Sequence, residues 1–337
     1  MLTVVVPAYN SEVYLGRCLD SLVGVDRVEV LVVNDGSTDR TAEIAADYAR
    51  RHPQVRVACQ ANGGHGGAVN TGVAQAQGDW IKVVDSDDWV DGTALSALID
   101  TLRAFGANGT GPDLVVCNFS YDKEGRRHPF LQHNRRALPP GRVVSWDDIG
   151  RFPFGRYLSM HALVYRLRVL RDCGLELPRH TFYVDNLYAF IPLRGVRTLY
   201  YLDANLYHYA IGRPDQSVNE QVMISRMEQQ LRVNRLLLAE LAARWRDPVL
   251  PPPLRRYLLH YAEIVTLVSA VLLTRSGEPE HLTAKAELFR WLSLTDKELG
   301  RWFQRRPLVR LVNLPQTIGR PLAALCYRAA HRVFGFN

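Results

Sequence analysis

The sequence contains few cysteines, and they show no pairing pattern. Five cysteines occur among 337 residues, far apart and without a CxxC pair: Cys18, Cys59, Cys117, Cys173 and Cys326. A disulfide framework and a cysteine-based zinc site are therefore excluded as the organising feature of the fold. We expect a reducing compartment and buried thiols.

Long apolar runs are also absent. The most apolar stretch, Ile264 to Leu273, follows His260 and Glu263 and falls short of the ~20 residues that a membrane span requires. The first residues carry no basic segment and no cleavage-like site, so no secretory signal is predicted. Internal repeats and low-complexity segments are missing as well. We expect a cytoplasmic protein in which this stretch forms a buried helix.

The positive charge of the chain is unevenly distributed. The net charge is +7, and the basic residues that alternate with apolar ones gather near the end: Arg301, Arg305, Arg306, Arg310, Arg320, Arg328 and Arg332. This pattern is more typical of a membrane-surface element than of a nucleic-acid reader, so no nucleic-acid partner is expected. Two interpretations stay open: peripheral contact with the inner face of the cell membrane, and an amphipathic helix packed on its own domain.

Strand and helix patterns alternate over the first part of the chain. Apolar strands at 4–6, 29–33, 55–59, 80–84 and 113–121 alternate with helices at 41–51, 68–77 and 93–105. Such an order predicts an α/β fold with a sheet covered on both faces. From 219 onward the pattern is helical, with predicted helices at 220–246, 254–274, 279–292 and 295–305. We therefore predict two domains, 1–218 and 219–337.

Polar residues follow four of these strands. Tyr9, Asp35, Asn62 and Asp85 stand at carboxyl ends of predicted strands, where open α/β sheets bind ligands. Asp85 opens the acidic run Asp85-Ser86-Asp87-Asp88, and carboxylates two residues apart can face one Mg²⁺ or Mn²⁺ ion. Taken alone, such a run is more often a solvated acidic turn that caps the following helix.

Five short motifs occur together in a recognisable order and spacing: Pro7–Asn10, Asn34–Asp39, Asn62–Gly67, Gly78–Trp80 and Asp85–Trp89. This set resembles the family 2 inverting glycosyltransferases of bacteria. The resemblance implies a GT-A-type mixed sheet flanked by helices, with an all-helical C-terminal appendage. It also implies Mn²⁺ or Mg²⁺, a UDP-sugar donor, and a hydroxyl acceptor on a cell-surface or lipid-linked glycan. The enzyme would be a hexosyltransferase, and a homo-oligomer stays open.

The resemblance assigns the loop residues to the donor and its metal. Asp87 is implied as the direct metal ligand and Asp85 as a residue near both ribose and metal, while Asp35 would accept hydrogen bonds from uracil or ribose. The remaining residues implied in nucleotide-sugar binding are Pro7, Ala8, Tyr9, Asn10, Asn62, Gly63, Gly64, Ser86 and Asp88. The glycines after Asn62, which include Gly66 and Gly67, would let the backbone approach the ligand.

An inverting reaction also needs a base. Asp185 stands where the family usually shows an acidic pair before an apolar helix, although Val184 replaces the first acid. Asp185 is therefore our candidate base, and a helix N-cap role fits the same position. Arg213 is implied as a bidentate ligand of the diphosphate, a contact that suits guanidinium geometry.

Three histidines have open roles. His208 is a candidate third metal ligand or phosphate contact, and His65 either supports the site or binds the ligand. His161, on a predicted strand, points to the acceptor pocket or is structural.

Two other classes of protein share parts of this pattern. A nicotinamide dehydrogenase is disfavoured because Pro7-Ala8-Tyr9-Asn10 stands where a GxGxxG fingerprint belongs. A catalytically inactive relative that binds nucleotide sugar or glycan, as a scaffold in polysaccharide assembly, is the remaining alternative. It would lack the metal carboxylates or the base, and this chain has candidates for both.

Overall fold

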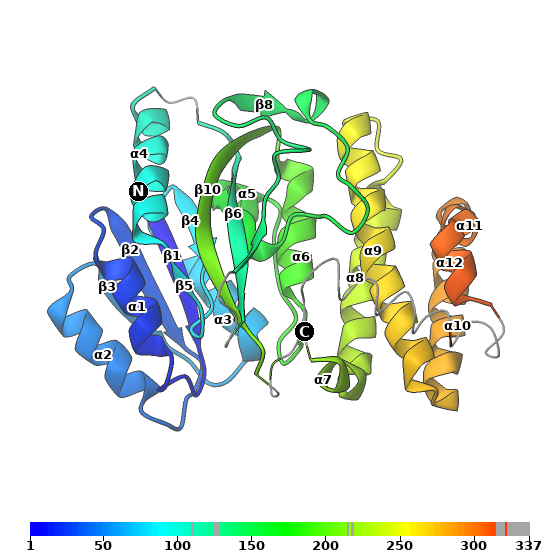
Figure 1. Ribbon diagram of the computed structural model, residues 1–337, viewed down its shortest axis with the longest axis horizontal. Coiled ribbons are helices and arrows are strands. Elements are labelled where there is room, and N and C mark those ends of the chain that lie inside the picture. Colours follow the sequence, from blue (N-terminus) through cyan, green and yellow to red (C-terminus); the bar gives the residue numbers. More distant parts are fainter. Residues whose placement is uncertain (109–110, 124–128, 214–215, 217–218, 315–320, 322–337) are drawn as a thin grey trace. The chain divides into compact units, whose positions relative to one another are not determined.

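The computed structural model describes residues 1–108, 111–123, 129–213, 216, 219–314 and 321 (Figure 1). It divides into two compact units, each described here by itself. The first comprises Met1–Pro153 and Leu158–Ala210, and the second comprises Phe154–Tyr157 and Ile211–Asn337.

The first unit is built on one mixed sheet. In the described residues its strand order is β3-β2-β1-β4-β9-β6-β10-β5. Four strands form its parallel part: β1 (Leu2–Ala8), β2 (Val28–Asn34), β3 (Val55–Cys59) and β4 (Trp80–Val83). The others on this path are β5 (Trp89–Val90), β6 (Leu114–Lys123), β9 (Leu163–Arg166) and β10 (Thr198–Ile211). The predicted mixed α/β fold is confirmed.

Helices cover this sheet and short strands extend it. The helices are α1 (Leu15–Val23), α2 (Thr41–Arg51), α3 (Gly64–Gln75), α4 (Gly92–Asn108), α5 (Leu167–Asp172) and α6 (Asp185–Phe190). The short strands β7 (Phe130–Gln132) and β8 (Val143–Ser145) pair with β6 and β10. Every residue of β1 and β2 is buried, which explains why these strands are mostly apolar. Their buried polar residues include Thr3 and Glu29, which bond to each other.

Strand β9 and helix α3 begin at other residues than predicted. The predicted strand that carries His161 begins only at Leu163, and His161 lies in the 3₁₀ turn Met160–Ala162 before it. Strand β9 lies antiparallel between β4 and β6. Helix α3 begins at Gly64, four residues before the predicted start, because its first turn is glycine-rich and hides the helical pattern. His65 consequently lies on a helix and not in a loop.

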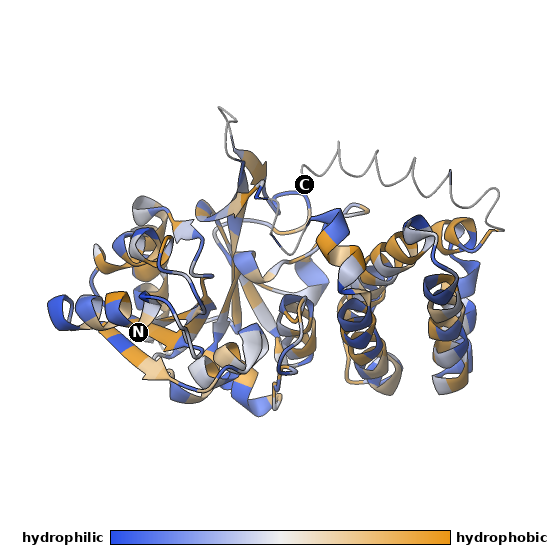
Figure 2. Ribbon diagram, turned by 90° about the horizontal axis from the view of Figure 1, so that it is seen from below, coloured by the Kyte–Doolittle hydropathy of each residue, from blue (hydrophilic) through white to orange (hydrophobic). Residues whose placement is uncertain are grey.

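The second unit is helical. It contains α7 (Glu220–Ser225), α8 (Met227–Arg244), α9 (Pro252–Ser276), α10 (Pro279–Thr295), α11 (Lys297–Arg305) and α12 (Pro307–Val312). The predicted single helix at 220–246 is broken at Arg226. Figure 2 shows both hydrophobic and hydrophilic residues on these helices.

Helix α9 is longer than the apolar stretch suggested. Helix α9 has 25 residues and a mean hydropathy of 1.6 in its best window, so by length and composition it could cross a membrane. The apolar stretch recognised in the sequence, Ile264 to Leu273, is too short for this. That window is 78% buried inside the structure, as in a core helix. Thr266 and Ser269 on this helix pair with Asn234 and Gln230 of α8 at 3.1 and 3.0 Å. These buried hydrogen bonds fix how α9 packs on α8.

The basic C-terminal segment is only partly described. Arg301, Arg305 and Arg310 lie on α11 and α12, and Arg306 donates to the buried Glu263 at 2.9 Å. The predicted basic residues Arg320, Arg328 and Arg332, like Cys326, lie outside the described residues. The other four cysteines are free thiols, of which Cys59 is exposed rather than buried.

Candidate functional site

Loops from neighbouring strands are tied together at the carboxyl end of the parallel part of the sheet. The Asn10 carboxamide oxygen accepts from the Thr38 N–H at 2.9 Å, which joins the loops after β1 and β2. The Ser11 and Ser86 hydroxyls lie 2.7 Å apart and join the loop after β1 to the acidic run. Tyr9 extends from the same loop with 52% of its surface exposed. The predicted donor-binding loops are therefore brought together at one edge of the sheet.

Asp35, at the end of β2, has one carboxylate oxygen without a protein partner in the described part of the chain. Its Oδ1 accepts from the Gln60 side chain at 2.6 Å and from the Gly63 N–H at 2.8 Å. Its Oδ2 is buried and accepts no hydrogen bond. Buried carboxylate oxygens are normally satisfied, so this atom is suited to accept a hydrogen bond from a ligand. Asn62, predicted to contact the same ligand, is exposed, and its backbone lies against Gly36, the residue after Asp35.

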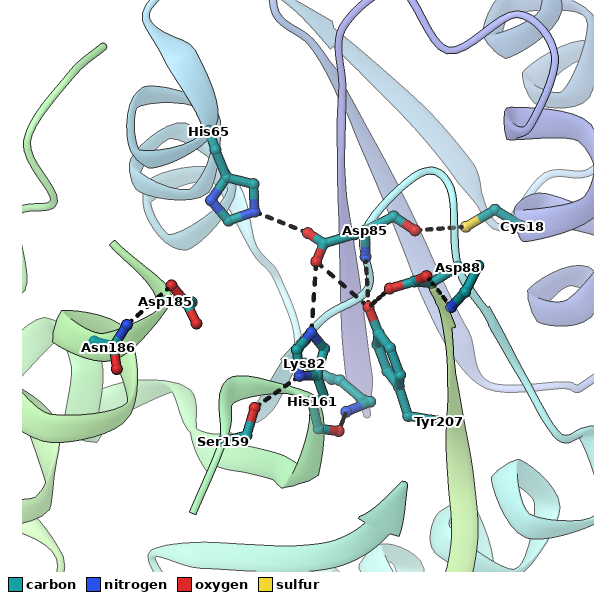
Figure 3. A network of polar contacts seen from close by, with 11 residues as sticks. Cys18, His65, Lys82, Asp85, Asp88, Ser159, His161, Asp185, Asn186 and Tyr207 are labelled. Carbon is teal, nitrogen blue, oxygen red and sulfur yellow. Dashed lines mark hydrogen bonds and ion pairs between the residues drawn. The ribbon is translucent and has the colours of Figure 1, made fainter. Parts of the chain in front are cut away.

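Asp85 stands between two histidines, as Figure 3 shows. His65 Nε2 lies 2.8 Å from Asp85 Oδ1, and His161 Nε2 lies 3.8 Å from Asp85 Oδ2. Burial opposes the charge on Asp85 and on His65, but their mutual attraction and hydrogen bond prevail. The pKa of Asp85 is lowered and that of His65 is raised. The structure thus favours an ionised carboxylate at Asp85, with His65 as its support.

Asp88 uses both of its carboxylate oxygens within the protein. Oδ2 lies 2.5 Å from the Tyr207 hydroxyl, and Oδ1 accepts from the Ala210 N–H at 2.8 Å. The side chain is fully buried, and burial together with the charges of Asp87 and Asp85 raises its pKa well above the usual value. Asp88 therefore attaches strand β10 to the acidic run, and its predicted contact with the sugar stays a prediction.

One group of side chains has the composition of a metal site. Asp85, Asp88 and His161 each offer a ligand atom, and these atoms lie within 4.8 Å of one another. Burial lowers the pKa of His161 to about 4, so its imidazole is neutral and its nitrogen lone pair is available. Carboxylate oxygens with a neutral imidazole suit Mn²⁺. The residues present thus fit a divalent cation.

Two contacts of His161 were not predicted from the sequence. His161 reaches Asp85 because β9 pairs with β4, a long-range contact that the residue pattern does not encode. Lys82, fully buried on β4, donates to the His161 carbonyl at 2.7 Å, and burial lowers its pKa to about 8. A lysine inside an otherwise apolar strand was the available signal for this contact.

Asp185 is the first residue of helix α6. The N-cap is Val184, which makes no side-chain capping bond, so the N-cap interpretation of Asp185 is wrong. Burial raises the pKa of Asp185 to about 6, partly offset by the attraction of His65. Its carboxylate is 3.4 Å from the Asn186 side-chain nitrogen. A carboxylate with this pKa is suited to take a proton near neutral pH.

His208 and Arg213 lie in different surroundings from Asp85. His208 Nδ1 is 3.0 Å from Asp122 Oδ2, and its ring stacks on Trp89 at 5.3 Å. Tyr207, its neighbour on β10, is the residue that reaches the acidic run. Arg213 belongs to the second unit, where its backbone N–H donates to Gln216 at 3.1 Å. The predicted metal or phosphate contacts of His208 and Arg213 stay predictions.

The glycines after Asn62 make close contacts with the protein itself. A Cβ on Gly64 would lie 2.9 Å from the His180 nitrogen, and one on Gly66 would lie 2.5 Å from the Pro178 oxygen. Gly64 also has φ +72°, which disfavours other residues. At these two positions, the close approach predicted for a ligand is made by residues 178–180 of the same chain.

Comparison with known proteins agrees with this geometry. The family model described as glycosyl transferase family 2 matches residues 3–163. An uncharacterized glycosyltransferase of Bacillus subtilis (strain 168), EpsJ, is 34% identical over 218 residues, which cover 62% of this chain and 60% of that protein. A chondroitin synthase of Pasteurella multocida (strain Pm70) is 38% identical over 158 residues, covering 45% of this chain and 14% of that protein. The chain thus spans less than two thirds of these relatives.

Solved structures share the fold. Residues 1–349 of TarS from S. aureus, in complex with UDP-GlcNAc, superpose with a TM-score of 0.71 at 20% identity, covering 97% of this chain and 92% of that one. The family model and the curated relatives thus confirm the predicted family for residues 3–163, while the solved structures agree in fold. Residues 3–163 match glycosyl transferase family 2.

Proposed function

We propose that this protein is a metal-dependent inverting glycosyltransferase. It moves a hexose-type sugar from a UDP-sugar to a hydroxyl of a cell-surface or lipid-linked glycan. The observation that carries the proposal is the arrangement of Asp85, held between His65 and His161, near Asp35, whose Oδ2 has no protein partner in the described residues. Opposite pKa shifts of two carboxylates support it. Asp85 is held ionised beside His65, whereas burial raises the pKa of Asp185 to about 6. Two carboxylates whose surroundings separate their pKa values are suited to separate chemical roles.

The nucleotide would bind at the edge of the sheet beside Asp35. The unpartnered Oδ2 of Asp35 would accept from the uracil N–H or a ribose hydroxyl, and the exposed Tyr9 ring would cover the base. Asn62 lies against Gly36, the residue after Asp35. The complex of TarS with UDP-GlcNAc, a protein of the same fold, supports this choice of donor.

Asp85 and Asp87 would hold the cation, with His161 beside them. A bound divalent cation would offset the negative charge on the departing diphosphate. His65 keeps the Asp85 carboxylate charged and oriented through its 2.8 Å contact, and Ser159 lies 2.7 Å from Nδ1 of His161. The protein's contribution is thus a carboxylate already arranged before the donor binds.

Asp185 would accept the proton of the attacking hydroxyl. Inversion requires this base to lie across the sugar from the leaving diphosphate. Its raised pKa makes the proton transfer more favourable than it would be for an ordinary aspartate, while leaving it largely ionised at neutral pH.

A donor panel tests the proposal. Nucleoside diphosphate release should be measured with UDP-, GDP- and dTDP-sugars, each with Mn²⁺, with Mg²⁺ and with a chelator. We expect release from a UDP-sugar that depends on the metal. Binding of a UDP-sugar without any release, with acceptor glycans present, would instead indicate the inactive relative.

The pH dependence of kcat/KM should report Asp185. A base works only when deprotonated, so activity should fall as pH decreases through the raised pKa of about 6. We expect roughly a tenfold fall per pH unit below that value and a plateau above it. UDP affinity over the same range is the control for effects on donor binding. A profile flat down to about pH 5 would contradict the assignment.

A further inference from the structure

The segment before Asp185 is attached to helix α3 through the side chain of Asn70. The Asn70 Nδ2 donates to the Leu177 carbonyl at 2.9 Å, and the Leu177 N–H donates to Asn70 Oδ1 at 2.9 Å. One carboxamide thus satisfies both backbone groups of one residue, as a neighbouring strand would. Leu177 is 107 positions away in sequence, so this is a tertiary attachment and not a local turn.

Further contacts extend this attachment along α3. The His180 N–H donates to the Gly63 carbonyl at 2.9 Å, just before the helix begins. Residues 178 and 180 pass so close to Gly66 and Gly64 that a Cβ at either glycine would collide with backbone. At the C-terminal end of α3, Arg171 donates to the carbonyls of Val73 and Ala76 at 3.1 and 2.9 Å. The segment is thus joined to α3 along its length.

Helix α3 is itself fixed against the sheet. A Cβ on Gly72 would lie 2.3 Å from a Val5 methyl, so the helix backbone packs directly on β1. From its first turn, His65 contacts Asp85. One rigid helix therefore holds Asp85 through His65 and the segment leading to Asp185 through Asn70.

The chain between Leu177 and Asp185 is short and strained. His180 and Tyr183 have φ values of 49° and 65°, in the left-handed region that residues other than glycine seldom adopt. Such conformations persist only where the surroundings determine them. Leu177 and Val184, at the two ends, are each 1% exposed. The attachment at Leu177 thus contributes to where Asp185 is placed.

We propose that Asn70 is a positioning residue that sets the placement of Asp185 relative to Asp85. This inference rests on the proposed function, in which Asp185 is the base. Asn70 acts through Leu177 and touches neither the donor nor the acceptor. Its loss should affect the chemical step and not donor binding.

The variants Asn70→Ala and Asn70→Asp test this role. Asn70→Asp keeps the acceptor for the Leu177 N–H, but it replaces the donor by a second oxygen that repels the Leu177 carbonyl. It is the second variant, used if the alanine variant does not fold. We expect kcat to fall by about 10- to 100-fold, since a displacement of ~1 Å in a reacting group costs about that much. Donor KM and UDP affinity should stay within about twofold, because α3 still packs on β1.

Hydrogen exchange gives a second readout. Backbone amides from 177 to 187 should exchange faster in the Asn70 variants, while those of β1 and β4 are unchanged. The matched control is Gln54→Ala, which removes a similar bond, from Gln54 Nε2 to the Val23 carbonyl at 2.9 Å, far in sequence from Asp185. This control should alter neither kcat nor exchange at 177–187.

Each outcome decides the matter. Unchanged kcat in a folded Asn70 variant would overturn the positioning role, whether or not exchange increases. Equal losses in kcat and UDP affinity would assign Asn70 to general stability instead. If the wild-type enzyme transferred no sugar from any donor, the proposed function would fail first, and the positioning role with it.

Discussion

Replacing Asp185 with asparagine is expected to lower kcat for sugar transfer by about 10³-fold, within the range typical of general-base catalysis. Asparagine has the same shape and can keep a contact with Asn186, but it cannot take a proton. Burial raises the pKa of Asp185 to about 6, which is the property that a base at neutral pH requires. UDP affinity should change little, because the unpartnered Asp35 oxygen and the Asp85 carboxylate are untouched. Steady-state kinetics with donor and acceptor, together with UDP calorimetry, measure both quantities.

Asp185→Glu is the matched variant. It keeps the carboxylate but moves it by about one methylene, so we expect an intermediate loss of ~10- to 100-fold. If Asp185→Asn kept more than about a tenth of wild-type kcat, Asp185 would not be the base.

The sheet and its binding loops were predictable from the sequence for a physical reason. Strands β1 and β2 are buried on both faces, so most of their residues are apolar, and a run of polar residues follows where they end. Asp35 and Asp85 could therefore be placed at one edge of the sheet. The start of α3 could not be predicted, because the glycines between 63 and 67 conceal the helical pattern of a turn that tertiary contacts stabilise.

The neighbours of these residues were not predictable. His161 reaches Asp85 because β9 runs antiparallel beside β4, and Asn70 reaches Leu177 across a large separation in sequence. Such contacts depend on strand order, which residue periodicity does not specify. The N-cap role of Asp185 was wrong for a more local reason, since the helix begins one residue earlier than that role requires.

Asp87 and Asp88 are adjacent acids with opposite expected roles. The Asp87 carbonyl accepts from Arg17 at 3.0 Å, and the Arg17 guanidinium lies 3.9 Å from the centre of the Trp89 ring. These contacts hold the backbone of the acidic run at Asp87, whose carboxylate the proposed site assigns to the metal. Asp88 is fully buried, with both oxygens bonded to Tyr207 and Ala210.

Asp87→Asn should therefore lose Mn²⁺ affinity and lower turnover by at least about 10³-fold, because a bound metal contributes several kcal/mol to such a transition state. Asp88→Asn should keep Mn²⁺ affinity within about tenfold, the lower end of what an indirect support of a metal site contributes. It should instead lose about 1 kcal/mol of unfolding free energy, since the new amide nitrogen replaces an acceptor oxygen. Manganese titration followed by electron paramagnetic resonance, and thermal unfolding without metal, separate the two effects.

The reverse result would identify a different metal site. If Asp88→Asn abolished Mn²⁺ binding while Asp87→Asn retained it, the ligands would be Asp85, Asp88 and His161, whose donor atoms lie within 4.8 Å of one another. Tyr207 would then have to release Asp88 when the ion binds. The double variant decides whether Asp88 is also a ligand. If Asp87 and not Asp88 binds the ion, adding Asp88→Asn to Asp87→Asn should lower the affinity by no more than the roughly tenfold expected of Asp88→Asn alone.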